Sequence, residues 1–483
     1  MIKPRLEVLS KDEIEEIHAR SLRILERVGI LVEHEEALKL LKDIGAEVDF
    51  NKKIAKIPEH LVNEALKRTP HIVRIYYRDG KKYIELGGWN TYFSGVPGPY
   101  LYIDWKTGEI RNLLSRDLAD WAKIIDALSN IHMASYLVPA DVPEIITDRW
   151  EVYVLVKNTS KPITASAYTL DGVPDVAKLM AAIIGQENVS KKPFLLHPIC
   201  NASPLKWDKR ITQIIMDCAR YKIPVRLTPM PSAGGTSPVT LAGTLLQANT
   251  EVLSGIVISQ FTKPGAPIVY AGSPIILEQK SAIPCPGYIE VALMAAAFSQ
   301  LAKFYRLPYG YSTLMTSDAK IPDQQAALES AFHALVATLS GVNIVLGAGG
   351  LLYALGVSPV KLVIDDDIAG SALRFAKGIH IDVETLADWL IEEVGPGGHF
   401  LKYKHTREWA RKEYYIPKLL DKFSVHAWKE KGSKMLGVVA KEYVEKILKE
   451  HVVEPLPPDI EKELDKTMLE IAKKYGIEKL PQI

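Results

Sequence analysis

The chain has 483 residues, of which 47% are hydrophobic, and its formal net charge is +1. This length and composition predict a folded protein with a large core, and the near balance of acids and bases argues against nucleic acid or an anionic membrane as a partner. We therefore expect the ligand to be a small molecule.

The first 30 residues carry charged side chains every few positions and contain no long apolar block. This pattern argues against a signal peptide and against a membrane span, so we predict a cytoplasmic protein. The three cysteines share no paired spacing, which argues against a disulfide framework and against a CxxC metal or redox site.

The N-terminal quarter of the sequence changes its periodicity once. Apolar residues recur at helical spacing over 11–30, 33–49 and 57–70, whereas residues 70–112 alternate apolar and polar side chains between Asp-Gly and Thr-Gly turns. Helices followed by small antiparallel hairpins are the expected result. We interpret residues 1–115 as an N-terminal extension of these two kinds of element.

From residue 116 onward, helical segments alternate with short apolar runs that end in Pro, Gly, Ser or Asp. The helical segments include 207–221, 238–262, 287–304 and 323–340. The eight apolar runs are IHMASYLVPAD (131–141), ITASAYTLDG (163–172), FLLHPICNAS (194–203), PVRLTPMPSAGG (224–235), PIVYAGSP (267–274), PYGYSTLMTSD (308–318), VNIVLGAGG (342–350) and KLVIDDD (361–367).

Eight strands that alternate with helices over about 250 residues predict an α/β fold of the (β/α)8 TIM-barrel type. The alternative is a doubly wound open sheet, but that fold calls for a glycine-rich phosphate turn after the first strand, and none is present. We place the barrel in residues 116–380 and a helical C-terminal extension in 381–483. Catalytic residues are expected just after the strands.

Several longer segments carry a family resemblance. They are DWKTGEIRNLLSRDLADWAKIIDAL (104–128), PMPSAGGTSPVTLAGTLLQANTEVLSGIV (229–257), PGAPIVYAGSP (264–274), TSDAKIPDQQAALESA (316–331), GAGGLL (347–352) and EVGPGGHFLKYKHT (393–406). Through these segments the chain resembles the trimethylamine methyltransferase (MttB-type) superfamily of corrinoid-dependent methyltransferases. The resemblance extends over nearly the whole chain and implies a TIM barrel.

The resemblance also bears on the substrate. Some members of that superfamily carry pyrrolysine in or beside the loop after the sixth strand, where this sequence has only standard residues. The chain is similar to the members without pyrrolysine, which implies demethylation of a quaternary amine such as glycine betaine. A quaternary nitrogen is already positive, so it can release a neutral tertiary amine without a general acid.

The methyl acceptor implied by the resemblance is the Co(I) of a corrinoid. None of the twelve histidines has an Asp two residues before it, so the DxHxxG pattern of corrinoid-binding proteins is missing. We therefore expect no cofactor bound by this chain and a cobalamin carried by a separate corrinoid protein, with this chain supplying position and electrostatics. A homo-oligomer is also predicted.

A quaternary ammonium group makes no hydrogen bonds and is best held by aromatic faces. The sequence places several aromatic residues on or beside the predicted strands, and ordinary core packing is the alternative role for each of them. The aromatic candidates for substrate binding are Tyr92, Phe93, Tyr168, Tyr270, Tyr309 and Tyr311, with Trp207 at the start of a predicted helix.

Two charged residues of the sixth-strand loop are the candidates for catalysis. Asp318 could act as counter-charge to the ammonium, and Lys320 could hold the carboxylate of a betaine. Gln324 lies beyond them as a possible substrate contact. The alternative is that this stretch only begins a helix, with Asp323 and Gln324 in its first turn.

Further polar candidates follow other strands. His197 and Asn201 are expected to line the pocket, and His399 lies in a glycine-rich turn that either folds over the mouth or joins two helices. A zinc site on His197 and Cys200 is rejected, because side chains three apart on a strand point to opposite faces and no further cluster completes the ligand set. The role of Glu251 is left open.

Two other functions stay open on the sequence alone. The chain could demethylate a different methylated amine, or it could be a barrel that binds quaternary amines without catalysis.

Overall fold

The structure is a computed structural model that describes residues 4–482. Its N-terminal part contains the three predicted helices, α1 (Lys11–Arg27), α2 (Glu35–Asp43) and α3 (Glu59–Arg68). Helix α1 begins with a reciprocal capping box between Ser10 and Glu13. Beside these helices lies a small sheet of β1 (Ile30–Val32), β2 (Glu47–Asp49), β3 (Ile54–Lys56) and β12 (Lys206–Trp207).

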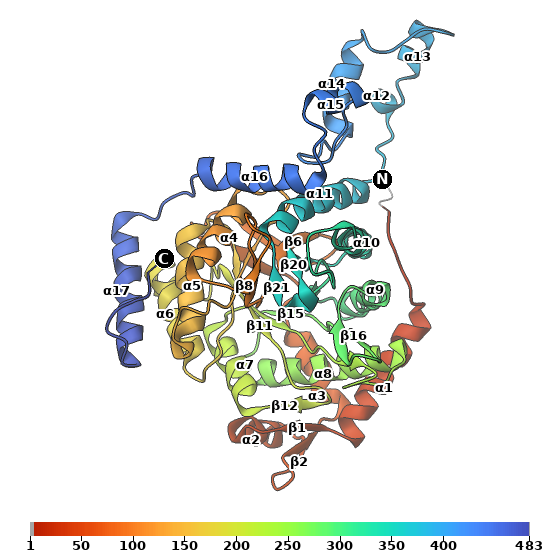
Figure 1. Ribbon diagram of the computed structural model, residues 1–483. Coiled ribbons are helices and arrows are strands. Elements are labelled where there is room, and N and C mark those ends of the chain that lie inside the picture. The colour runs from red at the N-terminus through yellow and green to blue at the C-terminus, as the bar shows by residue number, and fades with distance from the viewer. Residues whose placement is uncertain (1–3, 483) are drawn as a thin grey trace.

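Parallel strands form the centre of the molecule (Figure 1). One sheet has the order β15 (Ile268–Tyr270), β13 (Val225–Leu227), β11 (Leu195–Ile199), β10 (Ile163–Thr164) and β9 (Ala134–Ser135). A second has the order β18 (Gly310–Tyr311), β19 (Ile344–Ala348) and β6 (Tyr92–Gly95). Isolated parallel bridges join Ser94 to Met133 and Tyr270 to Tyr309, at the two places where these sheets meet. The α/β class is therefore as predicted.

Seven of the eight predicted runs contain one of these strands, and the eighth prediction was wrong. KLVIDDD lies inside helix α11 (Pro359–Ala376), and the remaining parallel strand is β6, which we had assigned to a hairpin. A short apolar run has the same composition in a buried helix as in a buried strand, so periodicity could not separate them. The boundaries of the three regions stay a prediction, although β6 shows that residues before 116 contribute to the parallel strands.

Helices surround the parallel strands on the outside (Figure 1). They are α4 (Ser115–Ala127), α5 (Thr147–Asn158), α6 (Gly172–Ile184), α7 (Lys209–Tyr221), α8 (Leu241–Thr262), α9 (Ile289–Phe304), α10 (Gln324–Ser340) and α11. By length and composition alone α8 could cross a membrane, but 72% of its most apolar window is buried within the protein. It packs against α1, α3 and α7, which explains an apolar surface on nearly every side.

Two hairpins lie where the sequence predicted them. The strands β7 (Leu101–Ile103) and β8 (Ile110–Asn112) pair antiparallel, as do β4 (Val73–Tyr76) and β5 (Tyr83–Leu86). Apolar side chains of the second hairpin pack on the inner face of the parallel strands, the side away from the helices. The cluster that they form with residues of the parallel strands consists of Val73, Ile75, Ile84, Leu86, Met133, Leu196, Val269, Ile344 and Leu346.

The carboxyl ends of the strands carry shorter elements. These are β14 (Ser232–Ala233), β16 (Ile275–Glu278), β17 (Ile283–Cys285), β20 (Gly350–Leu351) and β21 (Gly356–Val357). Between β20 and β21 the residues Leu352, Tyr353 and Ala354 all have positive φ, so three consecutive non-glycine residues are in the left-handed region. Such a turn is strained and directs Tyr353 toward the loop after β18.

The C-terminal region is helical and has two parts (Figure 1). Helices α12 (Val383–Leu386), α13 (Asp388–Val394), α14 (Lys404–Glu413) and α15 (Val425–Glu430) form an arm that projects from the body. Helices α16 (Leu436–Glu450) and α17 (Pro458–Lys474) lie against the body of the protein. There α16 packs on α11 and α4, and α17 packs on α6.

A glycine holds two strand-end loops together. Gly347 has φ +121°, and a Cβ built on it would lie 2.6 Å from the backbone nitrogen of Thr316 in the neighbouring loop. Backbone cannot move aside as a flexible side chain can. The loop after β18 therefore depends on a residue without a side chain in β19.

Gly347→Ala should lower the free energy of unfolding by about 2–4 kcal/mol, because the new methyl group meets backbone and the backbone conformation is unfavourable for alanine. Gly395→Ala is the control: Gly395 also has positive φ, at +65°, but nothing lies within 4 Å of its added Cβ, so only about 1 kcal/mol is expected. Urea unfolding midpoints measure both. Equal losses would show that the loops do not depend on this close approach.

Candidate functional site

Unpaired polar atoms gather around the parallel strands and the loops that follow them. Within residues 4–482, ten buried side-chain nitrogen or oxygen atoms have no hydrogen-bond partner. Buried polar groups are normally paired, so a concentration of unpaired ones marks a place where a ligand or water completes the bonding. Six of the ten belong to this region: Ser94 Oγ, Asn201 Oδ1, Arg226 Nε, Thr313 Oγ1, Thr316 Oγ1 and Asp318 Oδ1.

Polar and aromatic side chains on or just after four of the parallel strands lie near one another. We call this group the mouth cluster: Tyr136 after β9, Ser166 and Tyr168 after β10, Cys200 after β11, and Arg226 within β13. The rings of Tyr136 and Tyr168 lie 6.2 Å apart with an interplanar angle of 58°. Cys200 is exposed, yet the surrounding protein raises the pKa of its thiol to about 11.

A pocket of about 670 Å³ opens beside the two tyrosine rings. This volume is large enough for a small amine. Its lining comes mainly from the loops after β6, β9 and β10 and from the ends of α5 and α7: Gly98, Tyr136, Val138, Glu144, Ile145, Thr147, Tyr168, Thr169 and Arg210.

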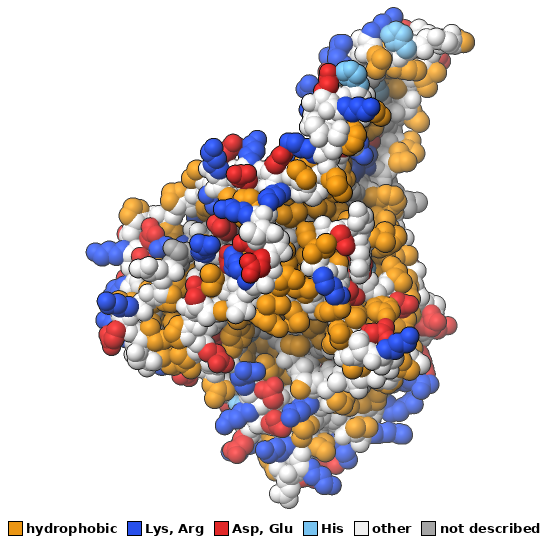
Figure 2. All heavy atoms as spheres, viewed as in Figure 1, with side chains coloured by type: hydrophobic (Ala, Val, Ile, Leu, Met, Phe, Trp, Pro, Cys, Tyr) orange, Lys and Arg blue, Asp and Glu red, His pale blue; other side chains and the backbone are white. Residues whose placement is uncertain are grey.

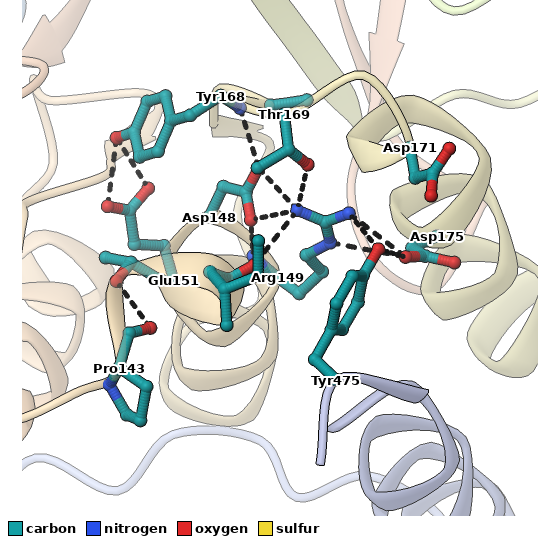
Figure 3. Close-up of polar contacts among 12 residues, drawn as sticks. Pro143, Asp148, Arg149, Glu151, Tyr168, Thr169, Asp171, Asp175 and Tyr475 are labelled. Carbon is teal, nitrogen blue, oxygen red and sulfur yellow. Dashed lines mark hydrogen bonds and ion pairs between the residues drawn. The ribbon is translucent and has the colours of Figure 1, made fainter. Parts of the chain in front are cut away.

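A buried hydrogen-bond network fixes the loop that carries Tyr168 (Figure 3). The Tyr168 hydroxyl donates to Glu151 at 3.0 Å, and its backbone N–H donates to Asp148 at 2.6 Å. Arg149 lies between Asp148 and Asp175, at 2.8 Å and 3.1 Å. Burial and the nearby Asp148 raise the pKa of Glu151 well above its usual range, which favours the protonated form of this side chain.

Arg226 is a buried cation of a different kind. Its Nη1 donates to Ser312 Oγ, its Nε has no partner, and no carboxylate of residues 4–482 lies within ion-pair distance of it. Burial lowers the pKa of Arg226 to about 10, so the guanidinium is charged at neutral pH. The sequence analysis did not single it out, although a charged residue between Val225 and Leu227 in an apolar run is an unusual signal.

Asp318 and Lys320 both lie on the loop after β18. Asp318 is only 9% exposed, and its Oδ2 accepts a bond from the Gly287 N–H at 3.1 Å. Burial and the nearby Glu329 raise the pKa of Asp318 to about 6. Lys320 is exposed, and its ammonium group donates to the Asp318 carbonyl at 2.8 Å and to the Tyr353 hydroxyl.

Three of the predicted cation-binding tyrosines face the helices instead of the pocket. Tyr270 donates to Asn249 of α8 at 2.6 Å and packs near Phe298 of α9. The hydroxyls of Tyr309 and Tyr311 donate to backbone carbonyls, and both rings are buried. In β18 the residue between them, Gly310, takes the inner position. These contacts favour the alternative of core packing.

Two further aromatic candidates, Tyr92 and Phe93, lie in the first half of strand β6, before its carboxyl end. Tyr92 is the first residue of β6, so it lies at the amino end, where its ring packs edge-on against His132. Phe93 is fully buried in the main hydrophobic core. Both positions favour packing.

Two polar candidates support neighbouring loops. His197 Nε2 accepts from the Ala167 N–H at 2.8 Å, and burial lowers the pKa of His197 to about 4, so its ring is neutral. Asn201 donates to Glu251 at 3.1 Å, while its Oδ1 stays free. Glu251 is not a solvated surface charge, because it is buried and its carboxylate also accepts a hydrogen bond from the Ser203 hydroxyl.

The last two candidates lie on the surface. Gln324 is exposed in the first turn of α10, whose N-cap is Asp323, as the helix-start alternative proposed. His399 is exposed between α13 and α14, so its turn joins two helices of the arm. Over the part of the chain that the structure describes, no group of three His, Cys, Asp or Glu residues is placed to hold a metal ion.

Comparison with known proteins now decides the family. Residues 2–475 match the family described as Trimethylamine methyltransferase (MTTB). The chain belongs to this family.

Members of the MTTB family from different organisms align with the chain almost end to end. The trimethylamine methyltransferase MttB of Methanosarcina barkeri (strain Fusaro) is 37% identical over 95% of this chain and 94% of its own length. The glycine betaine methyltransferase of Desulfitobacterium hafniense (strain Y51) is 33% identical over 98% and 99%. The chain is therefore a methyltransferase of the methylamine and betaine group.

A solved structure shows a similar fold. The crystal structure of the Methanosarcina barkeri monomethylamine methyltransferase (MtmB) superimposes with a TM-score of 0.58, over 93% of this chain and 89% of that one. At 11% identity the likeness concerns the fold alone.

Asp318→Asn should reveal the raised pKa of Asp318. Because that pKa is about 6 in the folded protein, above the ordinary 3.8, the folded state holds the proton more tightly than the unfolded chain. The free energy of unfolding of the wild type should therefore rise relative to the variant by roughly 2–3 kcal/mol as pH falls from about 7 to about 4. Denaturant titrations across this range measure it. A difference that stays flat or falls would show that Asp318 is not held in this environment.

Proposed function

We propose that the chain transfers a methyl group from a small quaternary amine of the glycine betaine type to Co(I) of a separate corrinoid protein. The observation that carries the proposal is the sixth-strand loop, where the family resemblance implies pyrrolysine in some members and this chain has Thr316, Ser317, Asp318, Ala319 and Lys320. Nothing in these side chains can activate a tertiary amine covalently. A relative named glycine betaine methyltransferase that aligns over 98% of the chain supports the same donor class.

The scaffold for this reaction is inferred to be a closed (β/α)8 barrel. Two parallel sheets of five and three strands, joined by parallel bridges at both junctions, support closure, and so does the outer layer of helices. The similar fold of the MtmB structure also supports it. In such a barrel the carboxyl ends of the strands form the mouth, where the mouth cluster and the sixth-strand loop both lie.

The reaction needs no proton from the protein. When the bond between nitrogen and the methyl carbon breaks, its electron pair stays on nitrogen, so the cation becomes a neutral tertiary amine. A Co(I) corrinoid on the partner protein would supply the electron pair for the new bond to the methyl group. Positive charge on nitrogen falls during the transfer, so an aromatic lining suits it better than a direct ion pair, which would hold the donor more tightly than the transition state.

Tyr136 and Tyr168 are the residues that fit the trimethylammonium end. Both rings line the pocket, and their mutual angle leaves two faces available for one cation. Of the residues named from the sequence, Asp318 keeps a proposed role as a nearby negative charge when ionised, and Asn201 offers a free Oδ1.

The proposal includes a homo-oligomer. It also includes the location in the cytoplasm that we predict from the sequence. Hydrophobic side chains lie along the projecting arm (Figure 2). Exposed apolar surface of this kind is typical of an interface, and a second copy of this chain is the proposed occupant. The residues concerned include Val383, Trp389, Leu401, Tyr414, Ile416 and Val425.

Donor choice tests the proposed function. The protein is mixed with cob(I)alamin, and loss of the Co(I) absorbance is followed with glycine betaine or trimethylamine as donor. Glycine betaine should react and trimethylamine should not, because only the first has a nitrogen activated by its permanent charge.

Tyr136→Leu should raise the donor concentration needed for half-maximal rate about fivefold to thirtyfold, and Tyr83→Leu, on the β4–β5 hairpin, serves as control. Demethylation of trimethylamine at a comparable rate would contradict the proposal.

A further inference from the structure

Among residues 4–482, Arg226 is a buried cation without the carboxylate partner that Arg149 and Lys361 have. Arg149 pairs with Asp148 and Asp175, and Lys361 lies 2.6 Å from Asp365. Arg226 is just as buried, at 1% exposed, but its single bond among residues 4–482 goes to the neutral hydroxyl of Ser312. A charge removed from water without a counter-ion is costly, so a fold retains it only when something else compensates it.

The position of Arg226 directs it into the site. In β13 it is in register with Val269 of β15, whose side chain belongs to the cluster on the inner face of the strands. Gly310 of β18 makes room for it, since a Cβ on Gly310 would lie 3.1 Å from Arg226 Cδ. The guanidinium is also near enough to the Tyr136 hydroxyl to influence the pKa of that tyrosine, so the two members of the mouth cluster lie close to each other.

We propose that Arg226 binds the carboxylate of the methyl donor and makes the site specific for carboxylated quaternary amines. The inference rests on the proposed function and names the residue that selects the donor. A planar guanidinium can bind a carboxylate through two parallel hydrogen bonds, and the unpaired Nε is a free donor for one of them. Carboxylate binding therefore removes an unfavourable unpaired charge and an unsatisfied hydrogen bond together.

This assignment differs from the prediction that Lys320 holds the carboxylate. Lys320 is exposed, and the Asp318 carbonyl and the Tyr353 hydroxyl already accept bonds from its ammonium group. A solvated, bonded ammonium gains little from a carboxylate, whereas a buried unpaired guanidinium gains much.

The same placement orients the donor. Arg226 lies within strand β13, whereas Tyr136 and Tyr168 come after the ends of β9 and β10. A carboxylate on Arg226 is therefore deeper than the ammonium group, which points its methyl groups toward the open end. That is the end from which an acceptor can approach.

The test measures binding of glycine betaine and of tetramethylammonium, which has no carboxylate, by calorimetry without corrinoid. Arg226→Gln should weaken glycine betaine binding about tenfold or more and change tetramethylammonium binding less than twofold. Arg226→Lys should recover part of the loss. The melting temperature of ligand-free Arg226→Gln should be unchanged or higher, because an unpaired buried charge has been removed.

A second variant keeps the guanidinium and covers the case in which Arg226→Gln does not fold. A Cβ in Gly310→Ala would lie 2.7 Å from Ile344 Cγ2 and 3.1 Å from Arg226 Cδ. Because it displaces Arg226, the variant should weaken glycine betaine binding more than tetramethylammonium binding. Equal losses for both ligands in Arg226→Gln and in Gly310→Ala, or a selective loss found only in Lys320→Ala, would overturn the assignment. Selective binding of glycine betaine without methyl transfer from any donor would instead contradict the proposed function and leave Arg226 as the carboxylate site.

Discussion

Side chains of successive strand residues point to opposite faces, and this alternation decides which parts of the protein can meet a ligand. Each short parallel strand offers only one or two positions to the inner face. Many of these positions are apolar and pack on the β4–β5 hairpin. Arg226 and Ser94, which are in register with Val269 and Leu346 of that cluster, and residues of the loops after the strands carry the unpaired polar atoms. The inner face therefore combines apolar packing with polar groups that are left free for a ligand.

Electrostatic compensation separates structural from functional charges within the same core. Arg149 pairs with two aspartates and thereby supports the loop of Tyr168, while burial raises the pKa of Glu151 beside it. Arg226 has no such compensation. A zwitterionic donor matches this distribution, since its anionic end completes the buried cation and its cationic end meets tyrosine faces at the mouth. The donor thus completes the charge balance of the site.

The sequence predicted most of the fold and the family but few of the site contacts. Seven apolar runs marked strands correctly, whereas KLVIDDD was assigned wrongly because acids buried in α11 resemble the polar end of a strand. The sequence could not predict whether Tyr309 and Tyr311 point to the inner or the outer face of the strands, since a two-residue strand shows no periodicity. Arg226 carried a signal, a charge within an apolar run, but only the fold shows that no carboxylate of the described residues pairs with it.

The most direct measurement is a crystal structure of the protein with glycine betaine bound. Our account predicts a donor carboxylate about 2.7–2.9 Å from the guanidinium of Arg226, with the trimethylammonium group against the rings of Tyr136 and Tyr168. A carboxylate bound to Lys320, or an Arg226 that still contacts only Ser312 beside the bound donor, would contradict it.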